Sequence, residues 1–101
     1  ADEARLRVEI GAVTLDIERH EVTVDNEPVI FTRSEFRLLW RMARSPGRVY
    51  SRDDLVESLT EGEAVILDRN IDVHVSSIRQ KLGVHGGSIV TVRGVGYKVV
   101  D

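Results

Sequence analysis

The spacing of apolar residues changes once along this chain, and that change constrains the possible folds most. Before residue 32 apolar and polar residues alternate, as around Val8 and Ile10, which is the two-residue period of half-buried strands. From Phe36 onward apolar residues recur three or four positions apart, which is the period of an amphipathic helix. Because 101 residues suffice for only one hydrophobic core, both kinds of element must pack together in one α+β domain.

Four short strands are predicted in residues 6–31. Turn residues separate them, at Gly11, at Glu18-Arg19 and at Asp25-Asn26. The apolar residues of the four segments are Leu6, Val8 and Ile10; Val13, Leu15 and Ile17; Val22 and Val24; Val29 and Phe31. The links are too short for parallel crossovers, so we expect an antiparallel sheet in which Leu15 and Val22 are buried against helices.

Two helices are predicted to follow the sheet. Thr32 and Glu35 have the spacing of a capping box, and Phe31 and Phe36 have that of a hydrophobic staple. Pro46-Gly47 ends this first helix, which carries Trp40 on its core face. The second helix begins after Ser51, and Asp53 and Asp54 in its first turn favour the positive end of the helix dipole rather than a catalytic carboxylate pair.

A third helix and a hairpin complete the chain. We expect Asp68 as the N-cap of this helix and Gly83 at its end. Its apolar stripe consists of Ile71, Val75, Ile78 and Leu82. Residues 89–92 and 97–100 then form two strands around the tip Arg93-Gly94-Val95-Gly96. Three helices closed by a β-hairpin are the plan of a winged helix-turn-helix, here with an N-terminal four-stranded antiparallel sheet.

The net charge of −3 hides an uneven distribution. Residues 1–30 hold 3 basic and 8 acidic side chains, whereas residues 69–98 hold 5 basic side chains and one acidic side chain, Asp72. A local field, rather than the charge of the whole chain, steers a partner. The C-terminal third should therefore attract polyanions such as nucleic acids, and the N-terminal third should repel them.

The face of the third helix opposite its apolar stripe is short, polar and poor in carboxylates. It presents Arg69, Val73, Ser76, Ser77 and Gln80, flanked by Asn70, His74 and Lys81 on one side and by Asp72 and Arg79 on the other. Such a face fits a DNA major groove, where Gln bonds adenine and Val contacts the thymine methyl group. A solvated face that lacks carboxylates by chance explains it equally well. Arg93 on a glycine-rich tip suits a narrow minor groove, and helix and tip together favour DNA.

Four segments of the chain resemble the OmpR/PhoB-type effector domains of bacterial two-component response regulators. They are Phe31-Thr32-x-x-Glu35-Phe36-x-Leu38-Leu39, Pro46-Gly47-Arg48-Val49-Tyr50-Ser51-Arg52-x-x-Leu55, Arg69-x-x-Asp72-Val73-His74-Val75-x-x-Ile78-Arg79-x-Lys81-Leu82 and Thr91-Val92-Arg93-Gly94-Val95-Gly96-Tyr97. The resemblance covers nearly the whole chain. It implies a sequence-specific, double-stranded DNA-binding output domain of a phosphorelay that regulates transcription and is not an enzyme.

The resemblance also implies roles for single residues. Val73 and Ser77 match positions that meet base edges in the major groove, and Arg93 matches the minor-groove arginine of the wing. The residues that match contacts to phosphates or bases are Arg52, Arg69, His74, Ser76 and Arg79, and we add Gln80, Lys81 and Thr91 to the predicted DNA-binding set. The loop from Thr60 to Leu67 matches one that touches RNA polymerase in some relatives, which makes Thr60, Glu61, Gly62 and Glu63 candidate contacts.

Two departures from the family pattern alter these expectations. Ser76-Ser77 stands where some relatives have arginines, so phosphate affinity should be lower. Leu59-Thr60-Glu61 stands where many relatives have a Trp-Gly pair.

The resemblance also predicts the domain organisation. The phosphorylated receiver domain is absent from the sequence, so residues 1–5 are interpreted as a linker remnant and residues 6–101 as the effector domain. The sheet is expected in residues 6–31 and the helices and wing in residues 32–101. We expect an isolated monomer that binds tandem half-sites.

The composition excludes several other classes of protein. Cysteine is absent, and the longest apolar runs are about four residues, far short of the ~20 that span a bilayer. The three histidines lack the spacing of metal ligands, so neither a metal nor another cofactor is expected. The absence of cysteine fits a reducing compartment, and we expect the protein in the cytoplasm. The alternative function is a winged-helix module that binds a protein through its acidic sheet and does not bind DNA directly. A steep salt dependence of DNA binding would exclude that alternative.

Overall fold

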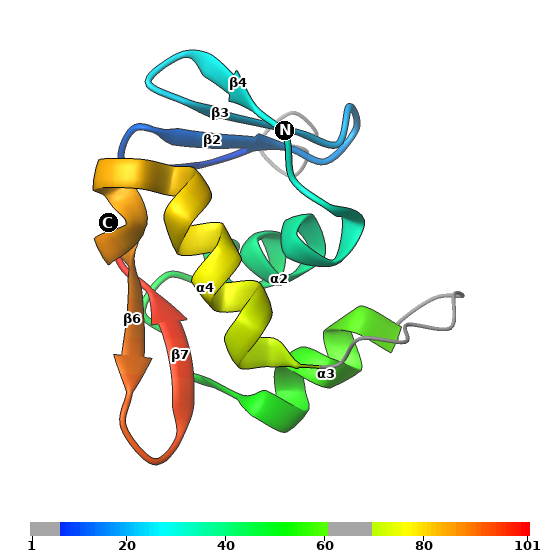
Figure 1. Ribbon diagram of the computed structural model, residues 1–101, viewed down its shortest axis with the longest axis vertical. Coiled ribbons are helices and arrows are strands. Elements are labelled where there is room, and N and C mark those ends of the chain that lie inside the picture. Colours follow the sequence, from blue (N-terminus) through cyan, green and yellow to red (C-terminus); the bar gives the residue numbers. More distant parts are fainter. Residues whose placement is uncertain (1–6, 61–69) are drawn as a thin grey trace.

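The computed structural model describes residues 7–60 and 70–101, and it places a four-stranded sheet across one end of three helices (Figure 1). The sheet consists of β1 (Arg7–Ile10), β2 (Val13–Asp16), β3 (Glu21–Val24) and β4 (Glu27–Val29), antiparallel and in sequence order. Leu15 and Val22 lie opposite each other and are 0% and 2% exposed. The predicted sheet with a buried inner face is therefore confirmed.

The turn between β3 and β4 shows how the sequence sets the strand pairing. Asp25 and Asn26 have φ values of 52° and 67°. A two-residue hairpin turn of type I′ needs positive φ at both central positions, and Asp and Asn tolerate it better than most residues. The predicted turn at these residues is confirmed.

The first two helices begin with reciprocal caps. At the start of α2 (Arg33–Ala43), Thr32 Oγ1 accepts the Glu35 N–H at 3.1 Å and Glu35 Oε1 accepts the Thr32 N–H at 2.8 Å, which is the predicted capping box. At α3 (Arg52–Thr60), Ser51 and Asp54 exchange the same two bonds, at 3.1 and 3.0 Å. These bonds lower the pKa of Asp54, and they confirm that its carboxylate caps the helix. Thr60, predicted as the first loop residue, is the last residue of α3.

The third helix, α4 (Ile71–Leu82), begins later than predicted. Asn70, not Asp68, is its N-cap, because the Asn70 side chain accepts the Val73 N–H at 3.2 Å. Asp68 itself lies outside the described residues. Gly83 ends α4 with a φ of 61°, and a short 3₁₀ segment, η1 (Gly83–Ser88), follows where only a turn was predicted. The predicted buried stripe of α4 is confirmed at all four positions.

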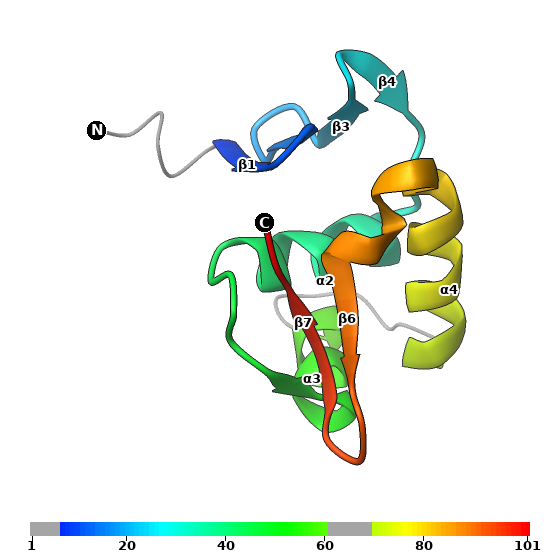
Figure 2. The ribbon, with the colours of Figure 1, turned by 90° about the vertical axis from the view of Figure 1, so that its left-hand side faces the viewer.

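The wing contains one strand more than predicted. The hairpin of β6 (Ile89–Val92) and β7 (Gly96–Val99) is joined by β5 (Tyr50–Ser51), which pairs with the outer side of β7. A Cβ added to Gly96 would lie 1.9 Å from the Tyr50 carbonyl oxygen, so only glycine permits this pairing. The extra strand connects the start of α3 to the wing, as Figure 2 shows from the side.

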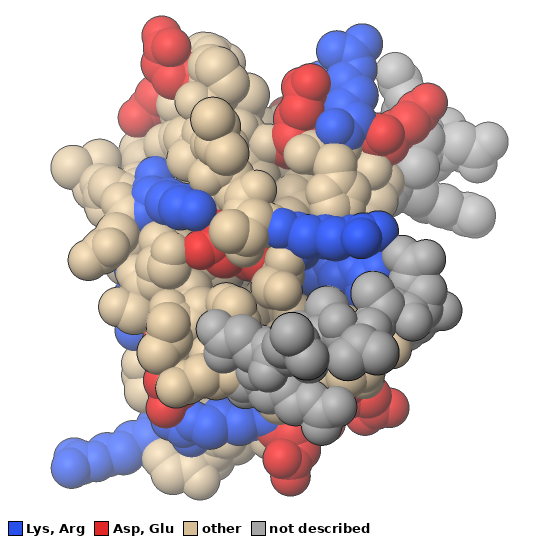
Figure 3. Space-filling view, turned by 45° about the vertical axis from the view of Figure 1, so that its right-hand side comes forward, with Lys and Arg blue, Asp and Glu red and all other residues tan. Residues whose placement is uncertain are grey.

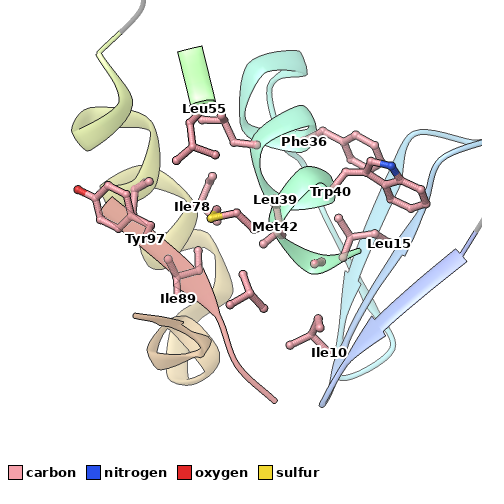
Figure 4. Packing of buried hydrophobic residues seen from close by; sticks show 14 of the residues in the cluster. Ile10, Leu15, Phe36, Leu39, Trp40, Met42, Leu55, Ile78, Ile89 and Tyr97 are labelled. Carbon is pink, nitrogen blue, oxygen red and sulfur yellow. The ribbon is translucent and has the colours of Figure 1, made fainter. Parts of the chain in front are cut away.

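One hydrophobic core joins the inner face of the sheet, the three helices and the base of the wing. Figure 4 shows Leu15 from the sheet, Phe36 and Trp40 from α2, and Tyr97 from β7 around it. Trp40 and Tyr97 are 8% and 5% exposed, as expected for core residues. No helix among the described residues is long and apolar enough to cross a membrane.

Candidate nucleic-acid interface

The predicted DNA-binding elements meet at the end of the molecule opposite the four-stranded sheet. The views of Figure 1 and Figure 2 agree that the N-terminal half of α4, the α3 helix and the tip between β6 and β7 all lie at this end. Most of the predicted site residues that the structure describes are carried by α4 and the wing. The geometry therefore offers a helix face and a projecting wing on one side of the domain.

The outward face of α4 carries uncharged side chains. Val73 is 54% exposed, and Ser76 and Gln80 are exposed beside it. These three residues lie opposite the buried stripe, because α4 turns 100° per residue. They are the base-reading candidates with fully accessible side chains.

Asp72 connects three elements of this surface. Its Oδ1 accepts a hydrogen bond from Arg52 Nε at 2.9 Å and one from the Tyr97 hydroxyl at 2.5 Å. These two bonds lower the pKa of Asp72, and the bond to Asp72 raises the pKa of Arg52. Burial, and then Asp72, raise the pKa of Tyr97. The one acidic residue on this helix face is thus partnered by a cation, and it holds Arg52 beside the start of α4.

Arg79, predicted to contact phosphates, is directed at the wing. Its Nε and Nη2 donate to the Ile89 carbonyl oxygen at 3.2 and 2.8 Å, and Nη2 also donates to Thr91 Oγ1 at 2.9 Å. The guanidinium carbon lies 5.6 Å from the centre of the Tyr97 ring. This half-buried side chain fixes the orientation of β6 relative to α4, and Thr91, another predicted contact residue, is one of its partners.

Ser77 and Lys81 point toward α2 rather than straight outward. The Ser77 hydroxyl donates to Glu35 Oε2 and Lys81 Nζ donates to Glu35 Oε1, both at 2.5 Å. Glu35 is only 4% exposed. Burial alone would raise the pKa of Glu35, but the bonds from Lys81, Ser77 and the Thr32 N–H lower it to about 2. The sequence revealed Glu35 as a capping residue but not as the anchor of α4.

The wing tip presents Arg93 without covering structure. Arg93 is exposed, Gly94 has a φ of 77°, and the turn is closed by a 2.9 Å bond from the Val95 N–H to the Val92 carbonyl oxygen. Val95 is itself 50% exposed. Gly94 provides the positive φ that the turn requires, so the tip stays narrow behind the guanidinium.

Some of the remaining predicted DNA-binding and polymerase-contact residues lie in the described part of the chain, and others do not. His74 is half-buried on α4, and Thr60 Oγ1 donates to the Glu57 carbonyl oxygen at the end of α3. Arg69, Glu61, Gly62 and Glu63 lie outside the described residues. Sequence reasoning missed the roles of Asp72 and Tyr97 as a connection between helix and wing. The only signal in the sequence is Tyr97 itself, because a buried tyrosine needs a hydrogen-bond partner for its hydroxyl.

Charge is separated along the molecule. Residues 7–31 hold two arginines and six carboxylates, and these carboxylates belong to the sheet and its turns. In Figure 3 carboxylates flank a basic side chain at the top, Lys and Arg side chains cross the middle, and both a basic side chain and carboxylates extend at the bottom. Among the described residues no three His, Asp or Glu side chains are arranged to hold a metal ion. The basic side chains of α4 and the wing therefore offer recognition of an anion.

Comparison with known proteins agrees with this geometry. Residues 26–99 match the family model "Transcriptional regulatory protein, C terminal". The chain is 35% identical to the phosphate regulon transcriptional regulatory protein PhoB of Pseudomonas aeruginosa over 90% of its own length, but it spans only 40% of that relative.

Two solved structures are similar over most of their length. The C-terminal effector domain of BfmR from Acinetobacter baumannii is 40% identical, with a TM-score of 0.79, covering 99% of this chain and 94% of that one. The DNA-binding domain of RstA from Klebsiella pneumoniae, solved in complex with the RstA box, is 30% identical, with a TM-score of 0.77, and the similarity covers 93% and 96% of the two chains. The chain therefore belongs to the OmpR/PhoB-type effector domains of response regulators, a family of transcription regulators and not of enzymes.

Proposed function

We propose that this domain binds double-stranded DNA sequence-specifically and regulates transcription as the output domain of a response regulator. The observation that carries the proposal is the exposed face of α4 with Val73, Ser76 and Gln80, because the N-terminal half of this helix lies at the same end of the molecule as the wing tip. An α-helix of this width fits the major groove, and the short side chains let the backbone approach base edges. The acidic sheet lies at the far end, where it does not oppose the phosphates.

The proposed contacts divide into two kinds. Val73, Ser76 and Gln80 read bases, with Ser77 able to join them from its position beside Glu35. The proposed phosphate contacts are Arg52, Arg69 and His74, together with Arg79 and Lys81 from their positions beside Ile89 and Glu35. Arg52 is already oriented by Asp72. Phosphate contacts position the helix and carry little sequence information, whereas base contacts specify the site.

Arg93 enters the minor groove in this proposal. A guanidinium gains most where the groove is narrow, as in A-tracts, because the negative potential is greatest there. Arg93→Ala should therefore lower affinity most for sites with an A/T-rich flank at wing distance. Equal losses on A/T-rich and G/C-rich flanks would make Arg93 an ordinary phosphate contact.

Further partners are proposed from the family alone. The longer protein would contribute a receiver domain whose dimerisation raises the effective concentration of two effector domains on tandem half-sites, so we propose that the isolated domain is a monomer. RNA polymerase is the proposed partner of Thr60, Glu61, Gly62 and Glu63. A regulator of this kind would act on DNA in the cytoplasm.

The test is a fluorescence-anisotropy titration with a duplex selected from a random pool, repeated at several salt concentrations. The proposal predicts a steep fall in affinity with salt, with a log–log slope of about 0.9 per neutralised phosphate. It also predicts that Val73→Ala changes which bases are preferred. No selectable duplex, or binding that is insensitive to salt, would contradict it.

A further inference from the structure

A second cationic surface lies on α2, on the side facing away from α4. Arg33, Arg37, Arg41 and Arg44 follow one another at intervals of four, four and three residues, so they share about 80° of the helix circumference. Glu35, which contacts α4, lies about 160° around α2 from the middle of this arginine stripe. The arginine stripe is thus separate from the proposed DNA-binding face.

Like charges at this spacing destabilise a helix. The one carboxylate within α2, Glu35, lies on the opposite side of the helix with Ser77 and Lys81, and the Asp54 carboxylate of α3 lies within electrostatic reach of Arg41. Burial lowers the pKa of the neighbouring His20, and the charges of Arg33 and Arg37 lower it further, which is the expected effect of a positive local potential. Such an arrangement favours the binding of an anion.

Three arginines of the stripe, Arg37, Arg41 and Arg44, line a groove between the sheet and α3. The cavity has a volume of about 330 Å³ and is lined by Ile17, His20, Phe36, Arg37, Trp40, Arg41, Arg44 and Ser58. One wall is aromatic, because the His20 ring stacks on Phe36 with centroids 4.0 Å apart and Phe36 stacks in turn on Trp40. On the other wall Arg37 Nη1 donates to the Leu59 carbonyl oxygen of α3 at 3.3 Å, which holds this guanidinium at the edge of the groove.

Arg41 lines this groove and also carries a buried donor without a partner. Its Nε is buried and has no hydrogen-bond partner among the described residues. Its guanidinium carbon lies 5.6 Å from the centre of the Tyr50 ring, and the side chain also borders a second cavity of about 290 Å³ next to Ser58 and Thr60. Buried polar groups in native proteins are normally paired, so the hydrogen bonding of the Arg41 guanidinium is incomplete among the described residues.

The groove fits a carboxylate-bearing protein segment better than a nucleic acid. The cavity of about 330 Å³ has the size of a small-ligand pocket and is far too narrow for a duplex, whose proposed binding face on α4 lies on the other side of α2. The flat guanidinium groups of Arg41 and Arg44 match carboxylates, and the aromatic wall matches an apolar side chain. We propose that this groove, between the β2–β3 connection and α3, binds a short acidic segment of a partner protein that carries carboxylates and an apolar side chain.

Nuclear magnetic resonance titration of the 101-residue chain tests the proposal. The probe is an acetylated, amidated peptide of sequence ELDEFL, and its matched control is QLNQFL, which has the same shape without charge. We expect saturable shifts of the Trp40 indole and Arg41 Nε–H signals with the acidic peptide alone. Arg41→Gln and Arg44→Gln should each weaken binding about fivefold or more, and Arg41→Lys should weaken it too, because lysine keeps the charge but lacks the planar pair of donors.

Three controls make the outcome decisive. The free glutamate anion at equal carboxylate concentration should not reproduce the shifts; if it does, the groove takes small anions and the proposal fails. A short duplex that shifts the same Trp40 signal would assign the arginine stripe to DNA instead. Arg44→Gln should keep or raise the thermal midpoint and leave duplex affinity unchanged, whereas a fall in the midpoint with no change in peptide binding would make the arginine stripe purely structural. Equal binding of both peptides would also overturn the proposal.

Discussion

The two ends of α4 are held by two carboxylates in different surroundings. Glu35 of α2 lies beside the C-terminal half of α4 and is 4% exposed. Its carboxylate accepts hydrogen bonds from Ser77, from Lys81 and from the Thr32 N–H. Asp72 lies in the first turn, more than half exposed, and receives Arg52 and Tyr97. Both have a lowered pKa, but only for Glu35 do hydrogen bonds outweigh a substantial cost of burial.

The difference in burial between Glu35 and Asp72 indicates which polar contacts stabilise the fold and which position the interface. An exposed ion pair contributes little to stability, because water screens both charges before and after folding. A buried carboxylate that loses a partner leaves an uncompensated charge, which is costly. We therefore expect the Glu35 cluster to hold α4 in place and the Asp72 cluster to orient Arg52 and the wing for a ligand.

The largest effect is expected from Glu35→Ala. This substitution removes half of the capping box and the partner of Lys81 and Ser77. It should lower the free energy of unfolding by about 3 kcal/mol. Urea denaturation measures the loss, with Glu57→Ala on exposed α3 surface as a control that should change little. A loss as small as that of the control would show that Glu35 does not anchor α4.

The second effect is a pH dependence that belongs to Glu35. Its pKa falls from an ordinary 4.5 to about 2 in the folded protein, so the charged form is stabilised by folding. The resulting stability, on the order of 3 kcal/mol, is present above pH 4.5 and is lost as the pH falls toward 2.

Unfolding measurements on the native protein and on Glu35→Gln test this dependence. Their difference in stability should shrink as the pH falls from 4.5 to 2, because protonation then removes the charge from the native protein also. A stability difference that stays constant from pH 4.5 to 2 would show that the pKa of Glu35 is not lowered by folding.

A matched pair of serines sharpens the comparison next. Ser77→Ala removes a donor from the buried Glu35 and should cost about 1–2 kcal/mol of stability. Ser76→Ala, one residue away and exposed, should leave stability unchanged and alter only DNA binding. Chemical denaturation of both variants decides this. Equal stability of the two variants would mean that the Ser77 hydroxyl is free for base recognition.

The smallest effect is expected from Tyr97→Phe. The ring stays in the core beneath Arg79, and only the hydroxyl bond to Asp72 is lost, so stability should fall by about 1 kcal/mol or less. The same denaturation assay measures it. A loss equal to that of Glu35→Ala would remove the distinction between the two ends of α4.

Local patterns predicted much of this fold from the sequence. Strand alternation, the Asp25-Asn26 turn and the Thr32–Glu35 capping box depend on residues within a few positions of each other, and each was placed correctly. The pairing of β5 with β7 joins Tyr50 to Tyr97, 47 positions apart, and no local period marks a two-residue strand. The start of α4 was wrong because Asp68 and Asn70 are both good caps and only packing chooses between them.

The sequence predicted which residues α4 carries near its outward face, but not where their side chains point. Helical spacing placed Ser77, Arg79 and Lys81 near the outward face of α4, and the structure turns each toward a neighbouring element. Long side chains on the border of a helix face reach whichever acceptor lies closest, and those acceptors, Glu35 and Ile89, come from other elements. Tertiary contacts of this kind are not visible in a helical period.

The most direct test of the account is to map a selected duplex onto the isotopically labelled domain by amide chemical-shift perturbation. The account predicts that the largest changes fall on the outward face of α4, at Val73, Ser76 and Gln80, and on the wing tip at Arg93, with little change in β1 to β4. Changes confined to the four-stranded sheet, with α4 and the wing unaffected, would contradict it.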